Sequence, residues 1–421
     1  MTRRPGGPAA RLAAGVAIGA AFVIAAAEGD VRAAGDEPAP APASEVRAAG
    51  DEPVVAPASV APAAAAPPAT TPAATTPPAA AARPSDGGPF ITPRLLVQGD
   101  AVVLHHGPSA PALEDGTTRP GFYLRRARAG LDAADGDWRA RAIVEVTART
   151  EVADAALDPI AGEMARGRTR ATEAYVAYAP GKAFTVALGS LRVPLGLSRQ
   201  IDEGGLRLPE RARVITRMAP DFRMGVAAWG DLGLLQYAVG GFSPAPVFGS
   251  DFRSSGSLTV VRLATEPLGP VGVAPDLRRS GDPWYGWWRV SAGVTGFYGA
   301  LPGSNELGVG GDAQFQWARV CATGELLWSR RDGADRLGFT LEPGVFVIRD
   351  RLELVARAEW FDDQLGAPSP SPADGWGAAL GATFFSAGAR ARLQAAATWR
   401  RGSADGDRAA TWAVIRATFT L

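Results

Sequence analysis

The sequence predicts an all-β protein, a transmembrane antiparallel β-barrel of about sixteen strands. Three observations lead to this fold class. Apolar and charged residues alternate along many short segments, and a period of two places them on opposite faces of a β-strand. The connections between these segments alternate between tight turns and long loops, as in barrels that cross a membrane. The last segment, 409–421, is amphipathic and ends on an apolar residue.

The alternation is clearest near the C-terminus, in segment 387–401, where one parity is alanine-rich and the other carries Arg390, Arg392 and Arg400. The first face suits lipid and the second bears fixed positive charge. Segments 137–149 and 351–361 sort in the same way. A soluble β-sandwich is the alternative, but charged inner faces do not suit a dry core. Tryptophans near the segment ends are typical of aromatic girdles at the two membrane interfaces.

The composition alone does not reveal a membrane protein, because 20% of the residues are charged and 47% are hydrophobic. Beyond the N-terminus the chain has no run of about 20 apolar residues, which a transmembrane helix needs. The charge balance is even, with 43 basic and 43 acidic residues, so we expect no binding of nucleic acid. The single cysteine, Cys321, excludes an internal disulfide.

The N-terminal residues 1–27 are expected to be a signal peptide for export. Three arginines precede an apolar run from Leu12 to Ile24, and three alanines stand before Glu28 as a cleavage site. A membrane anchor that is never cleaved is the alternative. If the signal is removed, 40 basic and 43 acidic groups remain, so any preference for anions must come from where the charges lie.

Residues 28–89 are expected to form a disordered periplasmic linker that is rich in proline and alanine. The motif R-A-A-G-D-E-P occurs in it twice, at 32–38 and at 47–53. A contact with the cell wall is a further hypothesis for this segment. The barrel then occupies 90–421.

Sixteen strand-like segments follow one another after the linker. They are expected near 93–105, 121–133, 137–149, 170–179, 182–192, 222–230, 232–242, 256–266, 285–299, 307–318, 319–330, 335–348, 351–362, 374–384, 387–401 and 409–421. Two connections depart from the alternation of turns and loops. Residues 267–284 are long where a tight turn is expected, and residues 331–334 are short where a loop is expected.

The last segment carries one apolar parity that ends on the final residue, Leu421. Such a strand resembles the assembly signal of outer-membrane barrels, with leucine in place of the usual phenylalanine. We therefore expect localisation in a bacterial outer membrane, in contact with the lipid bilayer and lipopolysaccharide.

The inner faces are expected to form an arginine-lined pore. Guanidinium groups stay charged at neutral pH and bind oxyanions through two parallel hydrogen bonds, so rings of them favour anions. The residues expected to line the pore or bind anions are Arg125, Arg126, Arg128, Arg139, Arg141, Arg192, Arg223, Arg390 and Arg392. Inward glutamates share the wall, and the alternative is that many of these arginines only pair with them. The group at 125–128 outnumbers nearby acids and is the better candidate for ion contact.

The longest predicted loop, 193–223, is the third of the long ones and is expected to fold into the barrel and narrow it. Pro194, Pro209 and Pro220 would stiffen such a constriction. Its expected constriction residues are Arg199, Arg207, Arg211, Arg213 and Arg217.

Several motifs between about residue 120 and residue 245 resemble the phosphate-selective porin O and P family. They are A-Y-V-A-Y at 174–178, V-A-L-G-S-L-R-V-P-L-G-L-S at 186–198, P-E-R-A at 209–212, R-M-G-V-A at 223–227, and R-R-A-R at 125–128 with Gly130. The resemblance implies a sixteen-stranded, homotrimeric porin with an anion site at its constriction. By matching motif it implies roles for Arg125, Arg126 and Arg192. The family's phosphate sites use lysines near the constriction, whereas Arg192 fills the corresponding place here.

Together these observations predict a passive outer-membrane porin for small anions, phosphate or related oxyanions, without cofactor or metal. A structural barrel that anchors the linker and a non-selective porin are the alternatives. An enzyme is not expected, because the only histidines, His105 and His106, are adjacent and point to opposite faces of a strand.

Overall fold

The computed structural model describes residues 89–106, 121–146, 169–244, 256–267, 288–301, 304–349, 351–365, 374–386, 390–402 and 409–421. The strands in these residues are β1 (Phe90–His106), β2 (Gly121–Asp135), β3 (Trp138–Val146), β4 (Thr169–Gly181), β5 (Phe184–Arg192), β6 (Phe222–Asp231), β7 (Leu235–Phe242), β8 (Ser257–Thr265), β9 (Arg289–Leu301), β10 (Ser304–Trp317), β11 (Val320–Arg331), β12 (Ala334–Ile348), β13 (Leu352–Asp362), β14 (Gly375–Phe385), β15 (Ala391–Gly402) and β16 (Ala409–Thr420). The expected signal peptide and, apart from Pro89, the expected linker lie outside the described residues.

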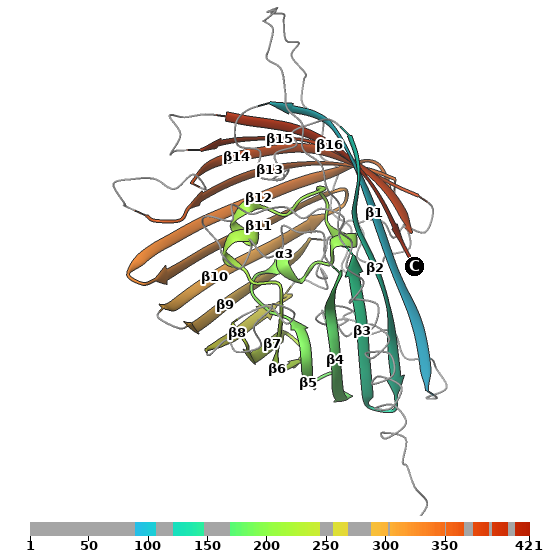
Figure 1. Cartoon of the computed structure of the whole chain (residues 1–421), viewed down its shortest axis with the longest axis vertical. Coiled ribbons are helices and arrows are strands. Elements are labelled where there is room, and N and C mark those ends of the chain that lie inside the picture. Colours follow the sequence, from blue (N-terminus) through green and yellow to red (C-terminus); the bar gives the residue numbers. More distant parts are fainter. Residues whose placement is uncertain are drawn as a thin grey trace, which may run out of the picture.

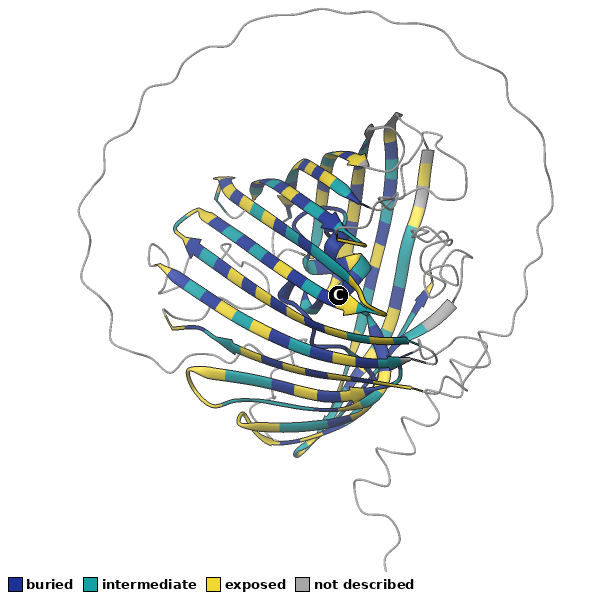
Figure 2. Ribbon diagram, turned by 90° about the vertical axis from the view of Figure 1, so that its left-hand side faces the viewer, coloured by how far each residue is buried: buried dark blue, intermediate teal, exposed yellow. Residues whose placement is uncertain are grey.

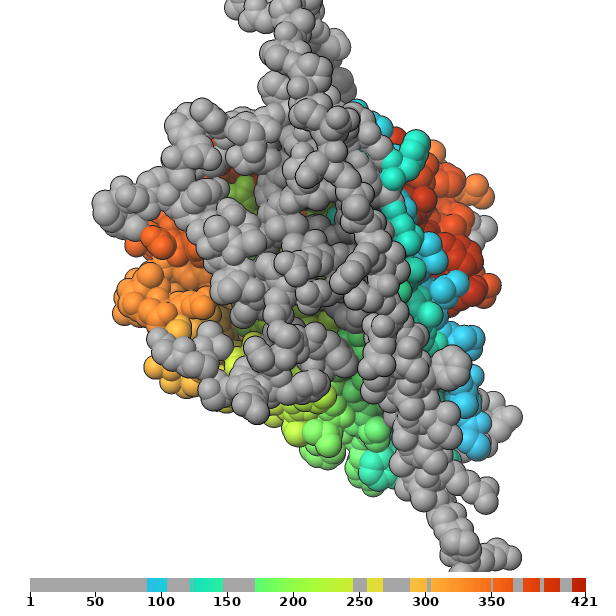
Figure 3. All heavy atoms as spheres, in the orientation of Figure 1, coloured from blue at the N-terminus to red at the C-terminus, as the bar shows by residue number. Residues whose placement is uncertain are grey.

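The sixteen strands form one closed antiparallel barrel, in which each strand pairs with its neighbours in sequence and β1 pairs with β16 (Figure 1). Figure 3 shows the blue N-terminal strand beside the red C-terminal strands along this seam. The fold class predicted from the sequence is therefore confirmed. Both unusual connections are present: β8 and β9 are joined by a long segment, and β11 and β12 by a tight turn at 332–333.

Side chains alternate between the two faces of the wall along each strand, which gives the striped pattern of Figure 2. In β13, Glu353 and Glu359 are buried toward the interior, whereas Leu354 is exposed on the outside. In β15, Gln394 is buried and Leu393 is exposed. An apolar outer face and a polar interior are the pattern of a barrel whose solvent on the outside is lipid.

Outward-facing aromatic residues gather at both ends of the strands. Trp138 and Tyr178 lie 5.2 Å apart between ring centroids, beside the tight turns that follow β2 and β4. At the opposite end, Trp360 and Trp376 lie 6.3 Å apart near the β13–β14 connection. These two groups fit the aromatic girdles that the sequence predicts at the membrane interfaces.

A β-bulge interrupts the pairing of β1 with β2. Gln98 pairs with Arg126 and the next residue, Gly99, pairs with Leu124, so Arg125 is an extra residue in β2. Leu124 faces outward. Arg125 interacts electrostatically with Asp100 and Arg126 inside the barrel. The bulge thus allows two consecutive arginines to contribute to the interior, which strict alternation would not allow.

Among the described residues, short helices occur only in the connection between β5 and β6. They are α3 (Leu197–Gln200), the 3-10 turn η3 (Glu203–Gly205) and α4 (Arg213–Met218). No helix within the described ranges is both long and apolar enough to cross a membrane.

Candidate functional site: the loop inside the barrel

The connection between β5 and β6, residues 193–221, lies inside the barrel rather than above its rim (Figure 1). We call it the inner loop. Its backbone or side chains contact strands on several sides of the wall, including β1, β2, β11, β13 and β15. It is therefore an element that narrows the barrel interior, and the candidate site is built where it meets the wall.

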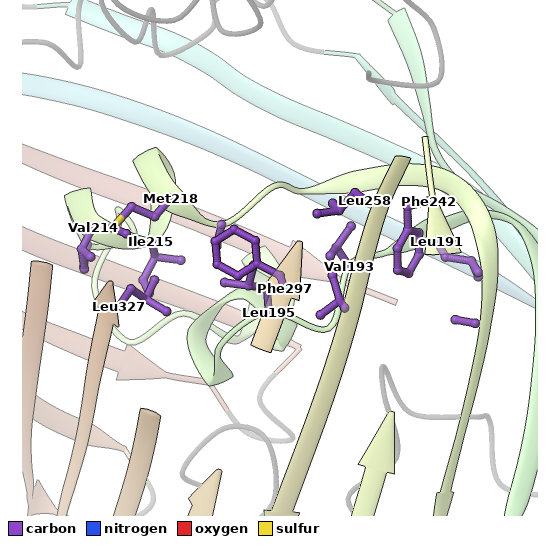
Figure 4. Packing of buried hydrophobic residues seen from close by; sticks show 14 of the residues in the cluster. Leu191, Val193, Leu195, Val214, Ile215, Met218, Phe242, Leu258, Phe297 and Leu327 are labelled. Atoms are coloured by element: carbon purple, nitrogen blue, oxygen red, sulfur yellow. The ribbon is translucent and has the colours of Figure 1, made fainter. Parts of the chain in front are cut away.

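One side of the inner loop is held by apolar packing. Val193, Leu195 and Ile215 are fully buried against wall residues that include Phe297 and Leu327 (Figure 4). Burying an aliphatic side chain of this size from water contributes roughly 1.5–3 kcal/mol. Glycine at position 338 of the wall leaves space for the loop, because a Cβ there would lie 2.6 Å from Val214 Cγ2.

Two wall glutamates hold the first turns of the loop's helices. Glu325 of β11 accepts hydrogen bonds from the backbone N–H groups of Leu197 (3.0 Å) and Ser198 (2.8 Å). Glu359 of β13 accepts one from the backbone N–H of Arg213, at 2.8 Å. Backbone donors in the first turn of a helix have no partner within that helix. These carboxylates therefore fix where α3 and α4 begin.

A third contact joins the middle of the loop to strands β12 to β15. Arg207 donates to Glu353 Oε1 at 2.8 Å and to the Glu342 carbonyl at 2.9 Å. The Arg207 carbonyl in turn accepts hydrogen bonds from Thr383 and Gln394 of the next two wall strands, β14 and β15. Arg207 thus braces the loop and does not stand free in the lumen.

The arginines of β2 reach acids on the loop. Arg126 lies 3.3 Å from Glu203 and 3.5 Å from Glu145, and Arg128 lies 2.7 Å from Asp202 and also contacts Glu145. The sequence predicts that the arginines at 125–128 outnumber the acids near them. This prediction is wrong, because Arg126 and Arg128 each lie beside two carboxylates. Loop residues far away in sequence fold back and supply the missing carboxylates.

Arg192, the last residue of β5, lies beside the same acids. Its Nη2 is 3.2 Å from Asp202 Oδ1 and 3.4 Å from Glu173 Oε1, and its guanidinium stands 5.0 Å from the centre of the Phe222 ring. Loss of part of the water around the half-exposed Asp202 would by itself raise its pKa, but Arg128 and Arg192 outweigh this effect and lower that pKa to about 2. The carboxylate therefore stays charged at neutral pH.

The remaining wall arginines of the prediction occupy different environments. Arg141 pairs with Asp132 (2.6 Å) and Glu173 (2.9 Å), and Arg392 donates to the Leu206 carbonyl of the loop at 2.9 Å. Arg223 is buried and donates to the Pro244 carbonyl, and Arg139 is half-buried on the inner face of β3. Arg390 is exposed and precedes β15, so it lies outside the strand in which the alternation placed it.

The other loop arginines bind mainly to the loop itself. Arg211 contacts Glu203 at 3.2 Å and the Ile201 carbonyl at 2.6 Å, and Arg199 donates to the Ala219 carbonyl at 2.9 Å. Burial lowers the pKa of Arg199 to about 10, which leaves it protonated at neutral pH. Arg213 is buried and Arg217 is half-buried.

Sequence reasoning missed the residue that completes the barrel seam. Asp100 of β1 receives two hydrogen bonds from Arg416 of β16, at 2.6 and 2.7 Å. Alternation along β1 would have placed Asp100 inside, but nothing local identifies its partner 316 residues away. Within the described residues, no group of three or more His, Cys, Asp or Glu side chains could hold a metal ion.

No known family model matches the sequence, and no curated protein matches it. Solved structures match the fold. OmpT of Vibrio cholerae, an outer membrane protein folded in vitro, superposes with a TM-score of 0.51 at 12% identity, covering 81% of this chain and 100% of that one. The outer membrane channel DcaP of Acinetobacter baumannii gives 0.50 at 13% identity, covering 80% and 99%. OprB of Pseudomonas putida gives 0.50 at 10% identity, covering 80% and 95%. The chain thus has the fold of the outer-membrane porin barrels.

Proposed function

We propose that the protein is a passive outer-membrane porin whose pore prefers small anions, phosphate or related oxyanions among them. The observation that carries the proposal is the convergence of three guanidinium groups, those of Arg126, Arg128 and Arg192, on the place where the inner loop meets β2 and β5. These groups are positioned before any ion arrives. Low-dielectric walls around them concentrate their field on a passing anion.

The carboxylates nearby moderate this preference. Glu145, Glu173 and Glu203 lie within ion-pair distance of the same arginines, so only part of the positive charge reaches a permeating ion. Permeation needs binding that is strong enough for the ion to approach and weak enough for it to leave. A wall whose arginines share their charge with nearby carboxylates supports a modest preference for anions and rapid flow.

A structural barrel is the second candidate, and the dense contacts of the inner loop favour it. In that role the barrel would anchor residues 28–89 in the periplasm, and any current would be incidental. A non-selective porin is a third. In all three cases we propose export by residues 1–27, assembly as a homotrimer and insertion in a membrane that contains lipopolysaccharide.

Planar-bilayer recordings in a salt gradient test the proposed selectivity. We expect a reversal potential that indicates anion preference, and a clear shift toward zero for the double variant Arg125→Ala and Arg126→Ala, because both residues contribute charge to the interior. Arg330→Ala is the matched control, since Arg330 is an exposed arginine paired with Asp335 at the rim. Cation preference, or no conductance, in the wild-type protein would refute the proposal.

Deletion of residues 28–89 separates the pore from the linker. Because the described barrel closes without this segment, we expect the deleted protein to keep the single-channel conductance of the full chain. Recordings of both proteins in the same lipid provide the comparison. Loss of channel activity after deletion would mean that the segment takes part in the pore.

A further inference from the structure

The Asp202 carboxylate of the inner loop lies between two arginines of the barrel wall, Arg128 and Arg192. We propose that Arg128 and Arg192 form a binding site for a small oxyanion such as phosphate, and that the Asp202 carboxylate occupies this site at rest and is displaced when the anion binds. This inference rests on the proposed function, because it assigns a specificity-determining residue to the same pore.

The two guanidinium groups converge on a single oxygen atom. Arg128 Nη1 lies 2.7 Å from Asp202 Oδ1, and Arg192 Nη2 lies 3.2 Å from the same Oδ1. The arginines come from β2 and β5, and the aspartate comes from the inner loop. The position of Oδ1 therefore marks a point where two charged donors from the wall meet, which is the arrangement that binds phosphate and carboxylate oxygens.

Both arginines are held in place without Asp202. Arg128 also contacts Glu145, and Arg192 donates to the carbonyls of Arg199 (3.3 Å) and Gln200 (3.1 Å). The Phe222 ring lies 5.0 Å from the Arg192 guanidinium and 6.0 Å from that of Arg128. Departure of the carboxylate would therefore leave a site that is already formed.

The site also has donors that the resident carboxylate does not use. Arg128 Nη2 and Arg192 Nε are buried and have no hydrogen-bond partner among the described residues. A buried donor without a partner costs free energy, and such groups are usually completed by water, an ion or a ligand. A tetrahedral oxyanion offers more acceptor oxygens than a carboxylate and can reach such donors as well as the place of Oδ1.

Asp202 differs from the other acids of this region in its exposure. Its side chain is 53% exposed, whereas the side chains of Glu145 and Glu203 are 0% and 10% exposed. An exposed carboxylate can rotate into water without the large cost of moving a buried charge. Asp202 is thus the acid that can leave its arginines most readily.

Phosphate block of chloride current through single channels tests the inference. Removing the competing carboxylate in Asp202→Asn should lower the phosphate concentration needed for half-block by roughly tenfold. Asp335→Asn is the matched control: it removes the same charge, but from an exposed ion pair with Arg330 at the rim of the barrel. We expect this control to change the block much less.

The outcomes are distinguishable. Equal block of wild type and Asp202→Asn, or equal sensitisation by both variants, would overturn the inference while leaving an anion-selective wild type intact. A wild-type channel that prefers cations would overturn the proposed function as well. If Asp202→Asn does not conduct, phosphate binding to the detergent-solubilised protein by titration calorimetry replaces the recording, and unchanged affinity relative to wild type counts against the inference.

The pH dependence of phosphate block is a second test of the role of the Asp202 carboxylate. The packed loop and wall remove part of the water around Asp202, which opposes its ionisation, but the facing charges of Arg128 and Arg192 prevail over this effect and over the nearby Glu203, and they lower its pKa to about 2. The stabilisation from this pair is present above the usual pKa of an aspartate and is lost only as pH falls through about 2. The difference in block between wild type and Asp202→Asn should therefore persist from about pH 7 to about pH 4. Its disappearance within that range would contradict the assignment.

Discussion

Asp100→Ala is expected to destabilise the barrel by about 3–5 kcal/mol, because it leaves a buried charge without its partner. Asp100 receives two hydrogen bonds from Arg416, at 2.6 and 2.7 Å, across the seam where β1 meets β16. The Arg416 side chain is almost completely buried. Arg125 also interacts with Asp100, so the substitution removes an acid that separates two guanidinium groups and leaves Glu210 as the acid that acts on both. Urea-induced unfolding in lipid vesicles, followed by tryptophan fluorescence, measures the decrease in the free energy of unfolding.

The chain provides a matched control for this prediction. Arg330 and Asp335 form an ion pair of 2.9 Å at the rim of the barrel, where both side chains are in contact with water. Exposed ion pairs contribute little to the free energy of unfolding, because water and salt screen the charges and the side chains lose conformational freedom when they pair. Asp335→Ala should leave the unfolding midpoint unchanged. If both variants unfold at the same urea concentration, the seam pair does not have the role assigned to it.

Glu325→Ala is expected to release the start of the inner loop and so to produce larger and noisier single-channel currents. The substitution removes the acceptor of two backbone N–H groups, those of Leu197 and Ser198. Leaving such donors without a partner costs on the order of 1–2 kcal/mol, which changes the population of the released loop by a factor of roughly 5–30. The apolar anchor around Ile215 stays, so the loop should loosen rather than leave the barrel.

A second variant and a control accompany this experiment. Gly196 has φ +73°, and a Cβ at this position would lie 2.5 Å from Glu325 Oε2, so Gly196→Ala should reproduce the phenotype. Glu325→Gln is the control, because it removes the same charge but keeps a side-chain oxygen that can accept a hydrogen bond from the loop backbone. This control should leave the current noise as in wild type. Noise that rises equally in the control and in Glu325→Ala would show that loss of lumen charge, and not release of the loop, is the cause.

The faces of the strands could be predicted because they depend on local sequence alone. A period of two puts Glu353 and Arg357 on one side of β13 and Leu354 on the other, whatever the neighbouring strands are. The number of strands and the closed sheet followed from repeating this argument along the chain. Arg390 shows where this argument fails. The alternation places it in a strand, but strand β15 begins one residue later, at Ala391.

The partners of the arginines could not be predicted, because they depend on the register of the closed sheet and the path of the inner loop. Arg128 meets Asp202 across 74 residues, and Arg207 meets Glu353 across 146. The bulge that brings Arg125 and Arg126 to the interior together is likewise a feature of strand pairing and not of either strand alone. The sequence supplied the charges of both signs without indicating which of them would meet.

The amino-acid sequence by itself determined a barrel wall with an apolar outside and a charged inside, since the alternation of side chains along a strand is a local property of the backbone. Only the tertiary structure decided how that charge is used. Closure of β1 on β16 and the passage of residues 193–221 through the lumen bring distant acids to the arginines, because the free energy of a buried charge is lowest beside an opposite one. The same folding leaves Asp202 at the water-facing side of two fixed guanidinium groups, a placement that no local pattern encodes.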